Sequence, residues 1–187
     1  MRKISKVNFR DVQALNGLRL CGYALRSDME RIISRNRVET LLKQGYIEAK
    51  KDIHDREVLT YTTKGKAFIK QLEALQGRTF YPKQANAIAH DTTLFHQYTL
   101  LSPEERMSAL SETETRDQFS EALEQLRNQA DEAWESMRHS IPDLVYTTTE
   151  GETVAIEITT SNYTQDKIEA KLAVATAIGA ELQTIKV

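Results

Sequence analysis

The chain has 187 residues, of which 28% are charged and 40% hydrophobic, a composition typical of a globular protein with one large domain or two small ones. No apolar stretch approaches the roughly 20 residues of a membrane-spanning helix. The first residues also lack the apolar segment of a signal peptide, so we expect a cytoplasmic protein with no membrane contact. The single cysteine, Cys21, excludes an internal disulfide.

The two halves of the chain carry opposite charge. Residues 1–80 contain 17 Lys and Arg against 9 Asp and Glu, a net charge of +8. Residues 81–187 contain 8 against 18, a net charge of -10. A basic half suits a polyanion such as nucleic acid, whereas an acidic half suits either a metal site or a solvated surface.

Two short helices are predicted after a first helix near residues 9–20. Ser27 followed three places later by Glu30 has the pattern of a capping box, which predicts a helix over about 28–33. A second helix begins at Ser34 or Arg35. Two short helices joined by a tight turn are typical of a helix-turn-helix.

The second of these helices has an apolar face and a polar face. Val38, Leu41 and Leu42 recur at helical spacing and are expected to point inward. Gly45 is expected to end the helix, because glycine readily adopts the left-handed conformation found there. The outward positions are Arg35, Asn36, Arg37, Thr40 and Lys43.

A strand pair and another helix follow. The segments "YIEAKK" and "VLTYTT" predict two strands joined by the polar turn "DIHDRE", and "KGKAFIKQLEAL" predicts a helix. The order and the phrase "LLKQGYIEA" followed by "YTTKGKAFI" resemble the winged-helix domains of bacterial DNA-binding proteins, over about residues 8 to 76. In the turn and strands, the resemblance implies DNA contacts from Lys50, Lys51, His54 and Arg56.

The outward side chains suit double-stranded DNA. Arg and Asn can bond base edges bidentately, whereas Lys and Thr suit phosphates. The alternative interpretation is a winged helix that binds protein, with ordinary solvated side chains on this face. Double-stranded RNA is disfavoured, because its deep and narrow major groove does not admit a helix.

The middle of the chain predicts a linker and three helices. Gly77 to Pro82 is expected to be the linker, giving domains 1–78 and 79–187. Helices are expected over about 83–100, from Pro103 after the capping residue Ser102, and from a capping box at Ser111 through about residue 130.

The last part of the chain predicts strands that carry acids. Pro142-Asp143 precedes the strand "LVYTTT", and Glu150-Gly151-Glu152 forms a turn. In the next strand, "TVAIEITT", alternation places Ala155, Glu157 and Thr159 on one side and Val154, Ile156 and Ile158 on the other. A helix capped by Thr164 and a short strand from Ala180 complete the order.

This layout resembles the PD-(D/E)xK nuclease superfamily. The resemblance implies that Asp143 and Glu157 are the acids that bind Mg²⁺, a cation that prefers hard oxygen ligands. It also implies a lysine two places after the second acid, where this chain has Thr159, which carries no positive charge.

Lys171 is the candidate replacement for that lysine. The helix 165–178 has an apolar stripe of Ile168, Leu172, Ala175 and Ile178, and Lys171 lies within it. A lysine that faces a sheet needs a polar partner, and a carboxylate pair would serve. The alternative is that the lysine reaches solvent from the edge of the stripe.

Both halves together resemble the replication-relaxation family of plasmids and integrative elements. The matching positions are His90-Asp91, Trp134-Glu135, Pro142-Asp143, Glu157 and Lys171. The resemblance implies an α+β protein that has an N-terminal winged helix and a C-terminal PD-(D/E)xK-like domain. Members of that family are linked to plasmid replication and conjugative mobilisation, so the resemblance implies a role of this kind.

The function expected from these patterns is that of a sequence-specific accessory DNA-binding protein of a mobile element, acting in plasmid replication, mobilisation or relaxosome assembly. We expect its nuclease-like domain to be inactive. Its partners would be double-stranded DNA, a relaxase or replication protein, and a second copy in a homodimer. Two alternatives stay open: an active endonuclease or nickase with Mg²⁺ as cofactor, and a winged-helix transcription regulator.

Overall fold

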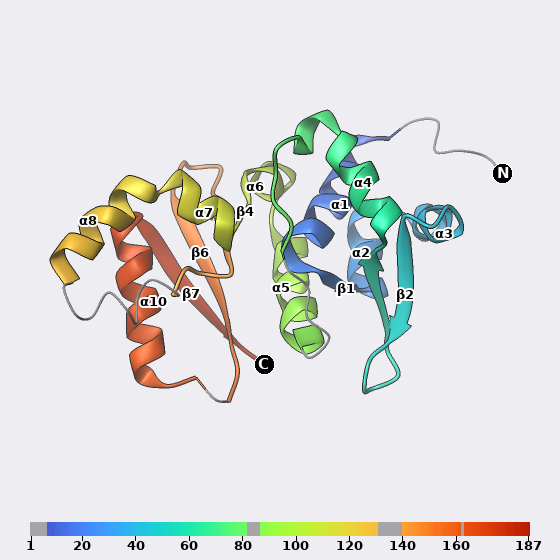
Figure 1. Ribbon diagram of the computed structural model, residues 1–187. Helices are drawn as coiled ribbons and strands as arrows, with labels where there is room; N and C mark the ends of the chain where they lie inside the picture. The colour runs from blue at the N-terminus through green and yellow to red at the C-terminus, as the bar shows by residue number, and fades with distance from the viewer. Residues whose placement is uncertain (1–6, 82–86, 131–139, 162) are drawn as a thin grey trace. The chain divides into compact units, whose positions relative to one another are not determined.

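The chain combines helices with two separate β-sheets, which confirms the predicted α+β class (Figure 1). The computed structural model describes residues 7–81, 87–130, 140–161 and 163–187. The chain divides into two units, Met1–Met107 and Ser108–Val187. None of the helices in these described stretches combines the length and apolar character needed to cross a bilayer.

The first unit contains most of the helices and a three-stranded antiparallel sheet with strand order β1-β3-β2. Its elements are, in chain order, α1 (Phe9–Cys21), β1 (Tyr23–Leu25), α2 (Arg26–Ile32), α3 (Arg35–Lys43), β2 (Ile47–Lys51), β3 (Glu57–Tyr61), α4 (Thr63–Gln71), η1 (Glu73–Leu75), α5 (Ile88–Leu100) and α6 (Pro103–Ser108), which spans the division. Strands β2 and β3 form a hairpin, in which Ile47 pairs with Tyr61 and Lys51 with Glu57. The helix pair and the hairpin expected from the sequence are therefore present.

Helices α1 and α5 pack closely in the core of this unit. The closest approach is at Gly17, where an added methyl group would lie 2.7 Å from the rings of both Phe95 and Tyr98. The Tyr98 hydroxyl donates to the Gln13 carbonyl at 2.8 Å, so the polar tip of this buried ring is satisfied. The packing requires a residue without a side chain at position 17.

The second unit contains a four-stranded sheet with order β4-β5-β6-β7. Its elements are β4 (Leu110–Ser111), α7 (Glu112–Gln118), α8 (Ser120–Ala130), β5 (Leu144–Thr147), β6 (Thr153–Thr159), α10 (Gln165–Ala177) and β7 (Ala180–Lys186). Strands β4, β5 and β6 pair antiparallel, whereas β6 and β7 pair parallel with α10 as the crossover. Gly151 turns the β5–β6 hairpin with a φ of 88°.

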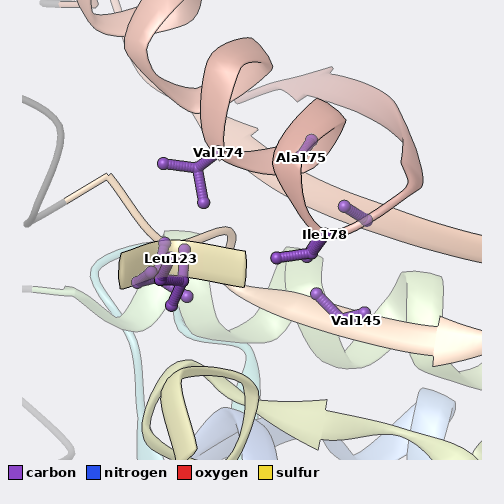
Figure 2. Packing of buried hydrophobic residues seen from close by; sticks show 7 residues of the cluster. Leu123, Val145, Val174, Ala175 and Ile178 are labelled. Atoms are coloured by element: carbon purple, nitrogen blue, oxygen red, sulfur yellow. The ribbon is translucent and has the colours of Figure 1, made fainter. Parts of the chain in front are cut away.

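An apolar cluster joins one face of this sheet to two helices. Figure 2 shows Val174 of α10 and Ile178, which directly follows α10, near Leu123 of α8 and Val145 of β5, and Ala175 belongs to the same cluster. Ile141 and Ala155 complete the buried set. The side of β6 that carries Ala155 therefore faces α10, and the alternation of a strand places Glu157 on that same side.

The division of the chain lies later than the expected boundary between residues 78 and 79. Helix α5 packs on α1, α2 and β1, so residues 87 to 107 belong to the first unit. Residues 78–81 form neither helix nor strand, but the chain returns to the same core at α5. The first unit as observed carries 19 Lys and Arg against 12 Asp and Glu, and the second carries 6 against 15.

Three local predictions were wrong. The capping box at Ser27 is absent, because α2 begins at Arg26 and has no side-chain cap. The helix expected from 112 to 130 is two helices, interrupted at Phe119. Strand β1 was missed, because its three residues are too few to show a period of two. The caps at Ser102 and Ser111 are confirmed.

Candidate functional site

Asp143 and Glu157 lie side by side on neighbouring strands. Leu144 pairs with Ile156, so the residue before β5 lies beside the residue that follows Ile156 in β6. The Asp143 backbone N–H donates to Glu157 Oε2 at 3.2 Å. The Ile158 backbone N–H donates to Asp143 Oδ2 at 2.8 Å. The structure thus brings together the two acids predicted from the sequence.

Lys171 of α10 reaches the same place. Its Nζ lies 2.8 Å from Glu157 Oε2 and donates to the Ile141 carbonyl at 2.7 Å. Lys171 and Glu157 are 9% and 1% exposed, so this ion pair is buried. The buried line of α10 runs through Lys171, Val174, Ala175 and Ile178. The predicted stripe was wrong at Leu172, which is 50% exposed.

Tyr163 completes the cluster and was not predicted from the sequence. It lies in the segment between β6 and α10, and its hydroxyl donates to Glu157 Oε1. Each oxygen of the Glu157 carboxylate therefore has a donor: Tyr163 for Oε1, and Lys171 with the Asp143 N–H for Oε2. The only sign of this role in the sequence was the position of the tyrosine a few residues after the strand that carries Glu157. We refer to Asp143, Glu157, Tyr163 and Lys171 as the Glu157 site.

The electrostatics of the Glu157 site follow from burial and from charge. Burial raises the pKa of the Glu157 carboxyl above its ordinary value, and the neighbouring Asp143 carboxylate raises it further. The Lys171 ammonium and the Tyr163 hydroxyl oppose that rise. Burial, followed by the hydrogen bond to Glu157, raises the pKa of Tyr163, so the phenol stays protonated and remains a donor.

The position of the expected lysine is neutral. Thr159 is buried, and its hydroxyl donates to the Ile185 carbonyl at 3.3 Å. The hydroxyl thus supports the β6–β7 pair and adds no positive charge. The positive charge beside Glu157 comes from Lys171 on the helix instead.

The Glu157 site as arranged does not fit a divalent cation. The described residues contain no group of three or more His, Cys, Asp and Glu side chains that could hold a metal. An ammonium already lies against Glu157 Oε2, and a phenol donates to Oε1. Mg²⁺ prefers two or more oxygen ligands with free lone pairs and repels a neighbouring ammonium. The magnesium role implied by the resemblance therefore has no suitable donor set here.

The remaining positions of the family resemblance are two residue pairs, His90-Asp91 and Trp134-Glu135. Trp134 and Glu135 lie outside the described residues. His90 and Asp91 belong to α5 in the first unit, where the His90 Nδ1 lies 3.1 Å from the Asp91 carboxylate. Asp91 is fully buried.

The predicted DNA contacts on α3 divide into exposed and engaged side chains. Arg35, Asn36 and Lys43 are exposed. Thr40 is half-buried, and its hydroxyl donates to the Asn36 carbonyl at 2.8 Å. The first turn of α3 is capped by Ser34, whose hydroxyl accepts from the Arg37 backbone N–H at 3.3 Å.

Arg37, which was predicted to contact DNA, is bonded to a carboxylate of α1. Its Nε and Nη2 donate to the two oxygens of Asp11 at 2.7 and 2.6 Å. Asp11 is 1% exposed and also accepts from the Asn8 backbone N–H in the capping box of α1. A bidentate guanidinium–carboxylate pair is strong and directional. Arg37 therefore fixes the start of α1 against α3.

The cations of the β2–β3 hairpin each have a carboxylate partner. Ion pairs join Lys50 to Glu48 at 3.2 Å, Lys51 to Asp55 at 3.4 Å and Arg56 to Asp52 at 2.7 Å. The Lys50 and Lys51 pairs are exposed and therefore weak, so these two lysines can exchange their carboxylates for phosphates, whereas the Asp52 side chain is buried. His54 is exposed at the turn, and its backbone N–H donates to Asp52 Oδ1 at 2.9 Å.

One arginine connects α2, α3 and the hairpin. Arg26 bonds Glu30 at 2.9 Å, Glu57 at 3.1 Å and also Glu39. The hydrogen bond that Arg26 donates to Glu39, followed by the one to Glu30, raises the pKa of Arg26. Arg26 was not predicted to have any role, since no local pattern brings Glu39 and Glu57 to it.

Comparisons with models of protein families, with curated proteins and with solved structures find no match to this chain.

Proposed function

We propose that this chain is a sequence-specific DNA-binding accessory protein of a mobile element. Its first unit would act as a winged helix, and its second as a PD-(D/E)xK-like unit that does not cleave. The observation that carries the DNA-binding proposal is α3, which presents Arg35, Asn36 and Lys43 to solvent beside a hairpin with three more cations. Arginine and asparagine are suited to base edges in a major groove that admits a helix.

The charge of the first unit supports this proposal. The excess of cations over acids lies in the unit that contains α3, whereas the second unit is acidic. Neutralising phosphates with Lys and Arg releases counterions, so binding should weaken steeply as salt increases. An acidic second unit does not favour a separate DNA-binding surface there.

The proposal that the second unit does not cleave depends on the Lys171–Glu157 ion pair. Hydrolysis of a phosphodiester in this superfamily would need a cation on the two carboxylates. In this chain an ammonium and a phenol already bond the Glu157 oxygens. We therefore expect the unit to serve as a scaffold in the assembly on DNA.

The test of DNA binding uses the full chain. Bound duplexes are selected from a random library, and affinity for the selected and a scrambled site is measured by fluorescence anisotropy. We expect a preference of about 10³ or more for the selected site. Arg35→Ala and Asn36→Ala should each weaken specific binding by about 1–3 kcal/mol.

Arg116→Ala is the matched control, because Arg116 is an exposed cation of the second unit. It should leave the affinity unchanged. If no duplex is preferred and the Arg35 and Asn36 variants bind like the parent, the DNA-reading proposal is wrong.

An active Mg²⁺-dependent endonuclease is the second candidate, and the convergence of Asp143, Glu157 and Lys171 favours it. Supercoiled plasmid incubated with Mg²⁺ or Mn²⁺ separates the two. We expect no nicking. Metal-dependent nicking that disappears in Glu157→Gln, while DNA binding persists, would establish the endonuclease instead.

A further inference from the structure

We infer that the Lys171 ammonium takes the place of a divalent cation in the second unit, and that removing it exposes a latent cation site. This inference deepens the proposal that the second unit does not cleave. It makes a positive prediction, a gain of metal binding in a variant. It does not depend on whether the first unit binds DNA.

The surroundings of the ammonium are those of a cation site. Lys171 Nζ is bonded to a carboxylate oxygen of Glu157 and to the main-chain carbonyl of Ile141, at 2.8 and 2.7 Å. Carboxylates and main-chain carbonyls are the hard oxygen ligands that Mg²⁺ and Mn²⁺ take in proteins. Asp143, at the start of the neighbouring strand, contributes a further carboxylate to the same cluster.

The charges support the same substitution. Asp143 and Glu157 together carry two negative charges, and Lys171 supplies one positive charge. Backbone N–H groups and one phenol give further stabilisation, since Ile158 donates to Asp143 and Tyr163 donates to Glu157. Without Lys171 the buried Glu157 carboxylate would lack its counter-charge, and buried charges need pairing or a metal. A divalent cation with its waters could then fill the space of the lost side chain.

Lys171→Ala removes the ammonium and leaves room for a hydrated cation. Mn²⁺ is the probe, because it is paramagnetic and broadens nearby amide signals. In the unaltered chain, Mn²⁺ should leave the amide of Ile158 sharp and the melting temperature unchanged. In Lys171→Ala, the Ile158 amide should broaden, and Mn²⁺ affinity should rise by about tenfold or more, with a matching rise in melting temperature.

Two controls make the result specific. Lys167→Ala removes an exposed lysine one turn earlier on α10 and should gain nothing. Lys171→Ala combined with Glu157→Gln should lose the gained affinity, because the amide is a weak metal ligand. These variants are also titrated with DNA, and their affinity should match that of the unaltered chain. A failure of DNA binding in all of them would count against the proposed function alone.

Three outcomes would overturn the inference. The first is a Mn²⁺ site in the unaltered chain that broadens Ile158 and disappears in Glu157→Gln, since a cation would then coexist with Lys171. The second is a folded Lys171→Ala chain that gains no affinity. The third concerns a Lys171→Ala chain that is unfolded in the absence of metal. We expect this chain to fold when Mn²⁺ is added. Persistent unfolding at saturating Mn²⁺ would contradict a latent cation site.

Discussion

The Glu157 site and the surface formed by α3 and the β2–β3 hairpin both contain predicted functional residues, but they differ in how their charges are paired. In the Glu157 site, the predicted Glu157 and Lys171 form a buried ion pair, and the backbone N–H of the half-buried Asp143 bonds Glu157. On α3 and the hairpin, most predicted cations are exposed, and the carboxylate partners of Lys50 and Lys51 are accessible too. Charges that meet an external phosphate must be accessible, whereas buried charges must be satisfied within the fold. We therefore call the Glu157 site closed, because its charges are paired within the fold, and the α3 and hairpin surface open, because most of its cations are accessible to a partner.

The largest effect on stability is expected from a substitution that removes the Lys171–Glu157 ion pair of the Glu157 site. Lys171→Met keeps the length of the side chain but removes the charge from a pair that is almost wholly buried. Removing one partner of a buried ion pair typically destabilises a protein by about 3–5 kcal/mol. Urea unfolding should show a loss of this size. Lys167→Met on the exposed side of α10 should change stability by less than about 0.5 kcal/mol.

A double-mutant cycle with Glu157→Gln tests whether the effect belongs to the pair. The double variant should be more stable than the sum of the two single losses implies, by about 1 kcal/mol or more. Strict additivity would show that Lys171 and Glu157 do not interact, and the closed character of the site would be refuted.

Arg37 and Arg35 sharpen the comparison within a single helix. Arg37→Ala leaves the carboxylate of Asp11 buried without its guanidinium, so we expect a loss of about 1–3 kcal/mol in unfolding free energy. Arg35→Ala should leave stability unchanged and weaken DNA binding instead. Chemical unfolding and anisotropy on the same two proteins separate the roles. Equal stability of both variants would contradict a structural role for Arg37.

Stability near Glu157 should depend on pH in a defined direction. The folded chain holds a proton on Glu157 to higher pH than the unfolded chain, because burial and Asp143 raise the pKa. Its contribution to stability is therefore full below the ordinary pKa of 4.5 and falls as pH rises through the raised folded value. The slope is at most about 1.4 kcal/mol per pH unit for one proton.

The difference in unfolding free energy between the unaltered chain and Glu157→Gln isolates that proton from the other acids. It should fall in this window as pH rises. A difference that is flat across the window, or that rises with pH, would contradict the raised pKa.

The smallest effects are expected on the exposed hairpin. Lys51→Ala should leave stability within about 0.5 kcal/mol, because the pair with Asp55 is exposed. If Lys51 contacts a phosphate, the slope of log affinity against log salt should decrease by about 1. Binding isotherms at several salt concentrations measure this. An unchanged slope would remove Lys51 from the proposed interface.

The sequence was informative where periodicity and local rules act. The α1 to β3 order, the cap at Ser111 and the alternation that places Glu157 on the α10 side follow from patterns within a few residues. Strand β1 and the packing of α5 on the first unit depend on contacts between distant segments, and no local pattern signals them.

The candidate site shows the same limit. The acids and Lys171 were identified from spacing and from the resemblance, but Tyr163 follows from a hydrogen bond across the loop before α10. The bond between Arg37 and Asp11 joins residues 26 positions apart in the sequence. Sequence patterns indicate which side chains face outward from a helix, but they do not indicate whether another element already binds them.

The Arg26 cluster has a consequence for recognition. Because one guanidinium bonds Glu39 of α3 and Glu57 of β3, the helix and the turn end of the hairpin strands are held together before any partner arrives. Little conformational entropy should then be lost when both elements engage one target, so the association is preorganised. With α3 and the hairpin held in one arrangement, their contact sites on the DNA must lie a fixed distance apart. A duplex whose groove geometry does not match that distance must deform to be bound.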